Sequence, residues 1–387
     1  MTADVVSAAT PTPPSAPKHA WLSWLFVLFL IYVLLAAVGA IGDGFKMASG
    51  DNAKALFDFA SNPIIALIIG IVTTALIQSS STVTSVIVGL VAGGLPIHIA
   101  IPMIMGANIG TSLTSTLVSL GHIRHGEEFR RAFSAATIHD SFNLLAVALL
   151  LPIELLFKPL AKTSEWLAQH LVSDANMSMS DVNFMKVIMA PAMDSLKWLV
   201  SAFPKLWAGV ILIVVGVALI LLVVSLISKI LRRLMVGRAK KIMHTAVGHG
   251  PVSGMASGTV LTMLVQSSST TTSLIVPLAG TGVFSLKQIY PFTLGCNIGT
   301  TITALLAATA ITGDNAVFAL QIALVHLFFN IFGILLIYVL PILRPVPIYM
   351  AETLAMLAQR SKMYVVAYIG GVFFVVPLAV LGITQSL

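Results

Sequence analysis

The sequence predicts an all-α polytopic membrane protein, an inverted-topology internal repeat with re-entrant helical hairpins and broken helices. Three observations support this fold class. Hydrophobic residues make up 58% of the 387 residues and charged residues 9%, with a mean hydropathy of +1.00, which is more apolar than a soluble core requires. Three polar motifs occur twice in the same order, and equivalent segments of the two copies differ in charge.

Four apolar stretches are each long enough to cross a hydrocarbon core of about 30 Å as a helix. A membrane β-barrel would show short strands of alternating polarity instead. The single cysteine, Cys296, excludes an intrachain disulfide. The four stretches are residues 21–41, 207–227, 316–340 and 363–383.

The chain divides into seven predicted segments. The first is rich in Thr and Pro and lacks the basic start and cleavage site of a signal peptide, so we expect a disordered tail. The segments are this tail (1–20), a first transmembrane repeat half (21–160), a periplasmic loop (161–205), a transmembrane helix (206–228), a basic cytoplasmic loop (229–249), a second repeat core (250–341), and an interfacial segment with the final transmembrane helix (342–387).

The net charge of +7 has its clearest source in one segment. Six basic residues and no acidic one lie between Lys229 and Lys241, which is the pattern of a cytoplasmic loop under the positive-inside rule. The charge therefore indicates orientation in the lipid bilayer, with the N-terminus predicted to be cytoplasmic. Nucleic acid is not an expected partner.

Three motifs recur in one order: QSSSTVTS returns as QSSSTTTS, GANIGT as GCNIGT, and HDSFN as HLFFN. An ordered triple indicates an internal duplication. The segment before the first copy (43–62) mixes acids and lysines, whereas its counterpart (229–250) is strongly basic. We therefore expect equivalent loops on opposite sides of the membrane. Such an inverted repeat is typical of secondary transporters, which bind substrate near the midplane.

Each QSSS motif is predicted to form the tip of a re-entrant hairpin, because the charge-free but hydroxyl-rich stretch around it is too polar to face lipid. We expect helices over 63–77 and 82–91 in the first hairpin and over 252–265 and 270–280 in the second. Ser81 or Ser269 would cap the departing helix, whose N-terminus and Gln amides would bind an anion without cationic side chains. The predicted anion-binding residues are Gln78, Ser79, Ser80, Ser81, Gln266, Ser267, Ser268 and Ser269.

An anion held by neutral donors in a membrane needs compensating charge, and a co-bound cation would supply it. Hydroxyl and amide oxygens suit an alkali cation, whereas zinc and copper prefer His and Cys. The NIGT motifs offer such oxygens on one helical face. An alternative is that their small residues only pack helices closely. The predicted cation ligands here are Asn108, Thr111, Thr114, Asn297, Thr300 and Thr303.

Asp140 is the only carboxylate within its apolar stretch, and an intramembrane acid is a functional hypothesis by default. The second copy has Leu327 at this position, so Asp140 breaks the repeat symmetry. We interpret Asp140 as an extra sodium ligand together with Asn143. The alternative is an ion pair with Arg130 or Arg131.

The two motif sets closely resemble those of the type II sodium-dependent phosphate cotransporters, over residues 60–160 and 250–340. The resemblance implies a symporter that couples inward sodium flux to uptake of inorganic phosphate, HPO4 2−, by alternating access. It implies that both QSSS motifs contact substrate and sodium. The sodium ligands of that family correspond, by this resemblance, to Gln266, Thr300, Thr303 and Asn143 in this chain. The predicted set of sodium ligands is completed by Asn330, the counterpart of Asn143 in the second copy.

The short, cysteine-free segment between the copies resembles bacterial members, which implies a multi-pass protein of the bacterial plasma (inner) membrane. Family members with Asp at the position of Asp140 are electrogenic, so net positive charge is expected to move inward. Sodium is then a co-transported substrate, and neither a cofactor nor enzyme activity is implied.

Three other functions were weighed. An intramembrane serine hydrolase would need one nucleophile with a partnered base, often in a GxSxG elbow, which this sequence lacks. A passive anion channel would show charged rings or a carbonyl filter. A sodium-coupled transporter of another oxyanion, such as sulfate or arsenate, fits the QSSS chemistry equally well, and only the resemblance favours phosphate.

Overall fold

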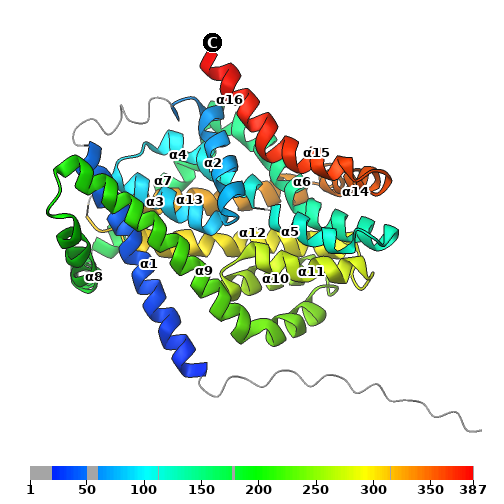
Figure 1. The fold of residues 1–387 in the computed structure, drawn as a ribbon, viewed down its shortest axis with the longest axis horizontal. Helices are drawn as coiled ribbons and strands as arrows, with labels where there is room; N and C mark the ends of the chain where they lie inside the picture. Colours follow the sequence, from blue (N-terminus) through cyan, green and yellow to red (C-terminus); the bar gives the residue numbers. More distant parts are fainter. Residues whose placement is uncertain (1–19, 50–59, 112, 177–178, 314, 387) are drawn as a thin grey trace, which may run out of the picture.

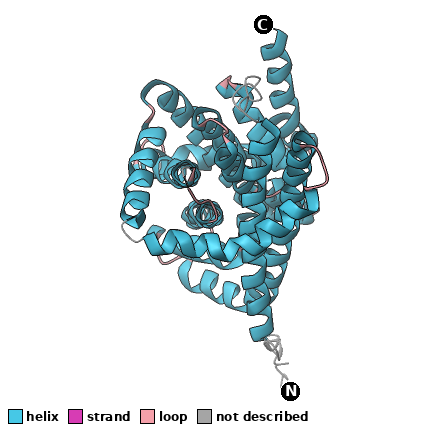
Figure 2. Ribbon diagram, turned by 90° about the vertical axis from the view of Figure 1, so that its left-hand side faces the viewer, coloured by secondary structure: helices cyan, strands magenta, loops and turns pink. Residues whose placement is uncertain are grey.

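The computed structural model describes residues 20–49, 60–111, 113–176, 179–313 and 315–386. They form α-helices with short 3-10 and π-helical segments, and no strand occurs among them (Figures 1 and 2). Seven of the described helical segments are long and apolar enough to cross a membrane. The predicted class, an all-α polytopic membrane protein, is confirmed. The predicted tail lies outside the described residues apart from Ala20.

Each copy of the motifs is built from the same series of helices. QSSS joins two short helices into a hairpin, NIGT lies on the next helix, and the His/Asn motif lies on the long helix that follows. The first copy comprises α2 (Pro63–Ile77), α3 (Ser80–Gly93), α4 (Ile97–Gly110), α5 (Leu113–Ser119), η3 (Leu120–His122) and α6 (Gly126–Phe157). The second comprises α10 (Pro251–Val265), α11 (Ser268–Gly280), α12 (Leu286–Thr309) and α13 (Ala316–Gly333).

Glycines let the first helix of each hairpin cross the NIGT helix at backbone contact. A Cβ at Gly106 would lie 2.0 Å from the carbonyl oxygen of Leu67, and a Cβ at Gly295 would lie 1.9 Å from that of Met255. Every other residue type carries a Cβ, so these crossings require glycine. The opposing glycines on the hairpin helices are Gly70 and Gly258. The close crossing is therefore duplicated along with the motifs.

The predicted class includes broken helices, but no break occurs at the second NIGT motif. Helix α12 runs without interruption from Leu286 to Thr309, through the motif. Glycine inside a helix costs about 1 kcal/mol relative to alanine, and the close crossing with α10 offsets that cost. In the first copy α4 ends at Gly110 and α5 begins at Leu113, with residue 112 outside the described residues.

The two hairpins run in opposite directions relative to α12. The C-terminal end of α3 lies beyond the C-terminal end of α12, where Asn315 Nδ2 donates a hydrogen bond to the carbonyl oxygen of Ala92. The C-terminal end of α11 lies near the start of α12, where Arg131 Nε donates to the carbonyl oxygen of Gly280 at 2.9 Å. These two ends are separated by the length of α12.

Two predicted segments are joined in the structure. Residues 206–228 and 229–249 were expected to be a helix and a loop, but α9 is a single helix over Lys205–Ala246. The basic segment consists largely of Leu, Met, Arg and Lys, which are strong helix formers, and the isolated Gly237 is tolerated. Helix α1 (Ala20–Ser49) packs along α9 (Figure 1), and at their crossing a Cβ on Gly209 would lie 2.5 Å from the carbonyl oxygen of Gly44.

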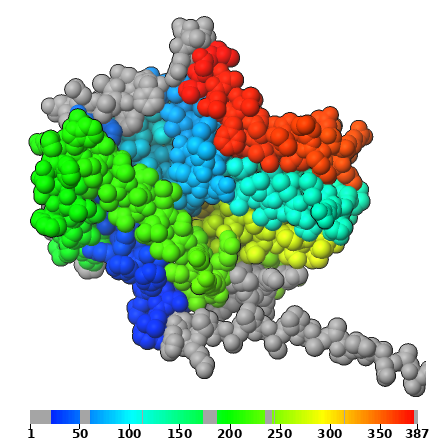
Figure 3. Space-filling view, viewed as in Figure 1, coloured from blue at the N-terminus to red at the C-terminus, as the bar shows by residue number. Residues whose placement is uncertain are grey.

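The segment between the two copies is helical, not a loop. Residues 161–205 lie mostly in α7 (Pro159–Asn176) and α8 (Met179–Val200). The C-terminal part begins with the π-helical segment η4 (Ile334–Val339). It continues as α14 (Pro345–Arg360), α15 (Met363–Gly370), the π-helical η5 (Gly371–Val375) and α16 (Val376–Ser386). Helices α8 and α9, in green, and the C-terminal helices, in orange and red, cover different parts of the face shown in Figure 3.

Candidate functional site

The two hairpin tips have the same backbone geometry. Gln78 and Gln266 each end the incoming helix in the left-handed conformation, with φ of 58° and 53°. The serine that follows caps the departing helix. Ser79 Oγ accepts from the backbone N–H of Thr82 at 3.3 Å, and Ser267 Oγ accepts from that of Thr270 at 3.2 Å.

The prediction that Ser81 and Ser269 cap the departing helices is therefore wrong. Helices α3 and α11 begin two residues earlier than expected, at Ser80 and Ser268, because the left-handed Gln reverses the chain without any intervening loop. The remaining QSSS serines lie in the first helical turn, where backbone N–H groups lack intrahelical acceptors. These four serines, Ser80, Ser81, Ser268 and Ser269, are all buried.

Each hairpin Gln contacts the threonine that follows NIGT by one helical turn. Thr303 Oγ1 donates to Gln266 Oε1 at 2.8 Å, and Thr114 Oγ1 donates to Gln78 Oε1 at 3.4 Å. The contact brings a predicted anion-binding residue and a predicted cation ligand together in both copies. The two sites differ in access, because Gln78 is exposed whereas Gln266 is half-buried.

The second hairpin tip also contacts the first copy. Ser269 Oγ donates to the carbonyl oxygen of Thr111 at 3.2 Å. The hydroxyls of Thr111 and Thr300 donate to carbonyl oxygens in their own helices, those of Ala107 and Cys296, at 3.0 and 2.9 Å. Both hydroxyl oxygens keep lone pairs that can accept, and Thr111 lies at the second tip.

Four buried asparagines join the two copies at their centre. Asn297 Nδ2 donates to Asn143 Oδ1 at 2.8 Å, and Asn143 Nδ2 donates to the carbonyl oxygen of Asn108 at 2.9 Å. Asn330 Nδ2 lies 3.4 Å from Asn108 Oδ1, and His139 Nε2 contacts Asn297 Oδ1. Each NIGT asparagine therefore meets the His/Asn motif of the other copy, a pairing that sequence order does not reveal.

Asp140 lies beside this cluster and is fully buried. The hydroxyl of Tyr368, from α15, donates to Asp140 Oδ2 at 2.6 Å. The proposed arginine partners bond elsewhere: Arg130 pairs with Glu127 at 2.9 Å, and Arg131 binds the Gly280 carbonyl. The alternative of an ion pair with these arginines is therefore not what the structure shows.

A cationic side chain at the second tip was missed from the sequence. Arg232 Nη2 donates to Thr270 Oγ1 at 2.7 Å, and one turn earlier Ser228 Oγ donates to the carbonyl oxygen of Gln266 at 3.3 Å. The sequence interpretation placed these residues at the end of one segment and in a loop. Because α9 continues as a helix, both side chains reach the hairpin.

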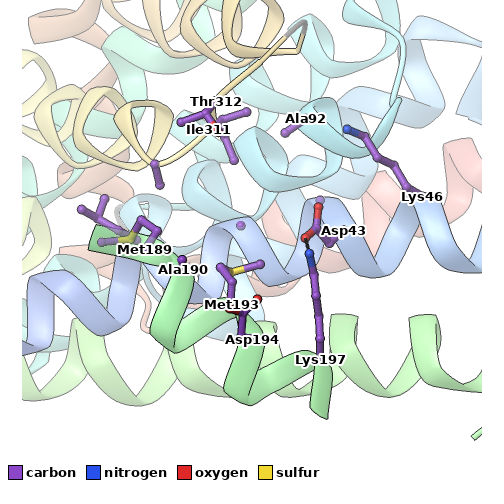
Figure 4. Close-up of a pocket in the computed structure, with 14 residues that line it drawn as sticks. Asp43, Lys46, Ala92, Met189, Ala190, Met193, Asp194, Lys197, Ile311 and Thr312 are labelled. Atoms are coloured by element: carbon purple, nitrogen blue, oxygen red, sulfur yellow. Dashed lines mark ion pairs between the residues drawn. The ribbon is translucent and has the colours of Figure 1, made fainter. Parts of the chain in front are cut away.

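A cavity of about 300 Å³ lies far from the tips, where the ends of α3 and α12 meet α1 and α8 (Figure 4). Lys197 Nζ and Asp43 Oδ2 form an ion pair across it at 2.7 Å. Lys46 and Asp194 add one charge of each sign to the lining. The lining is thus part polar and part apolar, with balanced charge, and it is separate from the QSSS and NIGT residues.

Comparison with known proteins agrees with these motifs. The chain is 35% identical to sodium-dependent phosphate transport protein 2A of Rattus norvegicus and 32% identical to sodium-dependent phosphate transport protein 2B of Homo sapiens. Each alignment covers 88% of this chain, but the chain spans only 64% and 62% of those relatives' lengths. No solved structure matches the chain. The profile of the Na+/Pi-cotransporter family matches residues 33–170 and 219–346, and this chain belongs to that family.

Proposed function

We propose that this chain is a secondary active symporter that couples inward sodium flux to the uptake of inorganic phosphate, HPO4 2−, by alternating access. The observation that carries the proposal is the duplicated contact between a hairpin-tip Gln and the Thr beyond NIGT, in a member of this family. It joins an anion-binding helix N-terminus to neutral oxygen ligands at both tips.

The QSSS residues supply the phosphate site. The first turns of α3 and α11 present backbone N–H groups and serine hydroxyls, and the helix dipoles favour negative charge there. Arg232 adds a cationic donor beside the second tip. A doubly charged anion would therefore meet neutral donors at both tips and one positive charge at the second.

Neutral oxygens of the NIGT and His/Asn motifs supply the sodium sites. Gln266 and Thr303 are in contact at the second tip, with Thr300 one helical turn before Thr303 on α12, and Asp140 and Asn143 lie one helical turn apart on α6. Such oxygen donors suit an alkali cation. Bound sodium would offset the charge of phosphate in a low-dielectric site, which gives a physical reason for coupling.

The opposite directions of the two hairpins relative to α12 support an inverted repeat, in which one hairpin opens to each side of the membrane. The basic residues of α9 place its C-terminal end in the cytoplasm under the positive-inside rule. Since α1 packs along α9 and starts near that end (Figure 1), the N-terminus would be cytoplasmic, in a bacterial inner membrane.

Radiolabelled phosphate uptake into proteoliposomes tests the proposal. With an inward sodium gradient we expect phosphate to accumulate above its outside concentration, and with choline in place of sodium we expect no accumulation. Sulfate and arsenate are tested as competitors in the same assay. Equal uptake with choline, or sodium-driven accumulation of sulfate but not phosphate, would refute the proposed coupling or the proposed substrate.

Replacing Asp140 with glycine should lower the charge moved per phosphate by about one elementary charge while some uptake remains, because the variant loses one anionic sodium ligand. Current and tracer uptake are measured together in voltage-clamped cells. An unchanged ratio of charge to phosphate would show that Asp140 does not bind a transported sodium ion.

Replacing Arg232 with glutamine should raise the phosphate concentration for half-maximal uptake by roughly fivefold, as expected for about 1 kcal/mol from a partly exposed charge. The matched control is Arg233→Gln, which removes the same charge from the next residue, where the side chain lines a hollow with Leu22 and Phe26 of α1. Phosphate affinity should stay at the wild-type value in the control. Equal shifts in both variants would mean that only the overall charge of α9 matters.

A further inference from the structure

We propose that Tyr368 is a positioning residue for Asp140, which fixes the orientation of the carboxylate for sodium binding. The inference rests on the proposed function, because it assigns a role within sodium coupling. Tyr368 lies outside the residues matched by the family profile and belongs to neither copy of the motifs.

The contact is short and its two partners come from distant parts of the chain. Tyr368 Oη lies 2.6 Å from Asp140 Oδ2, a distance typical of a hydrogen bond to a charged oxygen. The acceptor lies midway along α6 and is fully buried, so the hydroxyl reaches it within the protein interior.

Helix α15 has an exposed side and a side that faces the protein, where Val365 is 3% exposed. Tyr364 and Val366 on this helix are 45% and 65% exposed, as expected for side chains that face lipid. Tyr368 instead turns inward, with its ring packed edge-on against Phe133 of α6 at 6.5 Å between centroids and against Phe373 at 6.0 Å. The two rings fix the direction of the phenol, so the hydroxyl is held toward the carboxylate.

The backbone beyond Tyr368 is irregular in a way that suits this role. The next segment, η5, is π-helical over Gly371–Val375, and it brings the buried Phe373 against the tyrosine ring. Single-turn π segments occur frequently at functional sites. In a regular α-helix, the residues beyond Gly371 would point in other directions around the helix axis relative to Tyr368.

A phenol is well suited to orient a cation-binding carboxylate. It donates one hydrogen bond and carries no charge, so it holds the carboxylate without neutralising it. An arginine would cancel the charge that sodium needs. Ligating carboxylates are commonly hydrogen-bonded by such outer groups, and loss of those groups typically lowers metal affinity by about 10–100-fold.

The test compares two isosteric variants. Tyr368→Phe removes only the hydroxyl, and Tyr364→Phe makes the same change at an exposed tyrosine one helical turn earlier. In sodium-driven phosphate uptake we expect Tyr368→Phe to raise the sodium concentration for half-maximal uptake at least about tenfold. The phosphate requirement at saturating sodium should stay close to wild type, and Tyr364→Phe should match wild type throughout.

A second comparison separates positioning from packing. In the Asp140→Gly background, adding Tyr368→Phe should change nothing further, because the hydroxyl then has no carboxylate to orient. Sodium-dependent stabilisation of the purified protein against heat gives a binding readout without transport, and Tyr368→Phe should need correspondingly more sodium.

The outcomes distinguish this inference from the proposed function. If the wild-type protein shows no sodium-dependent uptake, the proposed function itself fails. If the wild type is sodium-dependent and Tyr368→Phe keeps the wild-type sodium requirement, the positioning role is overturned while the function stands. A shift of the same size in the Asp140→Gly background would also overturn it, because the hydroxyl would then act independently of the carboxylate.

Discussion

Gly295→Ala will strongly reduce the amount of folded protein in the membrane. The new Cβ would lie 1.9 Å from the carbonyl oxygen of Met255 and 2.9 Å from its Cα, so α10 and α12 must move apart. These neighbours are backbone atoms within a helix, which cannot rotate out of the way as a side chain can. We expect the free energy of unfolding to fall by at least about 3 kcal/mol, which is at the upper end of overpacking effects.

Gly370→Ala is the matched control for Gly295→Ala. A Cβ at Gly370, the last residue of α15, meets no heavy atom within 4 Å. The same substitution there should leave stability unchanged or raise it by about 0.5–1 kcal/mol through a less flexible unfolded chain. Thermal melting of both purified variants gives the comparison. Similar melting temperatures for the two would contradict the backbone crossing of α10 and α12.

Gln266→Gly will abolish most transport while leaving the fold intact. The residue has a φ of 53°, which glycine adopts more readily than glutamine. The substitution should therefore raise the free energy of unfolding by roughly 1 kcal/mol through relief of backbone strain. Loss of the hydrogen bond from Thr303 costs about as much. Stability should therefore change little. The proposed phosphate site loses an amide donor, and since a hydrogen bond to a charged group is worth about 1.5–3 kcal/mol, uptake should fall at least tenfold.

Lys158→Gly provides the same backbone change outside the site. Lys158 ends α6 with a φ of 57° and is exposed to solvent. Glycine there should preserve both melting temperature and sodium-driven phosphate uptake. The interpretation of Gln266 would be refuted by a glycine variant that folds and transports normally.

Much of the fold could be predicted because the signals were local. Apolar length predicts the membrane helices, and the repeated motifs predict the duplication and both hairpins. The predicted starts of α3 and α11 were wrong by two residues because a left-handed Gln is rare and no glycine marks the turn. The basic end of α9 was predicted as a loop because charge was given more weight than the strong helix propensity of Leu, Met, Arg and Lys.

The cross-copy contacts could not be predicted from one sequence. Asn297 and Asn143 are far apart in the chain, and nothing in their local patterns shows that each NIGT motif meets the other copy's His/Asn motif. Tyr368 looked like one more aromatic residue in an apolar helix. Only the folded arrangement shows that its hydroxyl reaches Asp140.

In the proposed transport cycle, the glycine crossings would also limit which parts of the molecule can move. Where α10 meets α12 through Gly258 and Gly295, sliding would drive backbone against backbone, so each hairpin and its following helix must travel as one rigid body. The copies meet instead through side-chain bonds such as that from Ser269 to Thr111. Each such bond is worth about 1 kcal/mol and can exchange partners. In the proposed transport cycle the two copies would therefore move relative to each other, while each hairpin Gln would keep its contact with the Thr beyond NIGT in its own copy.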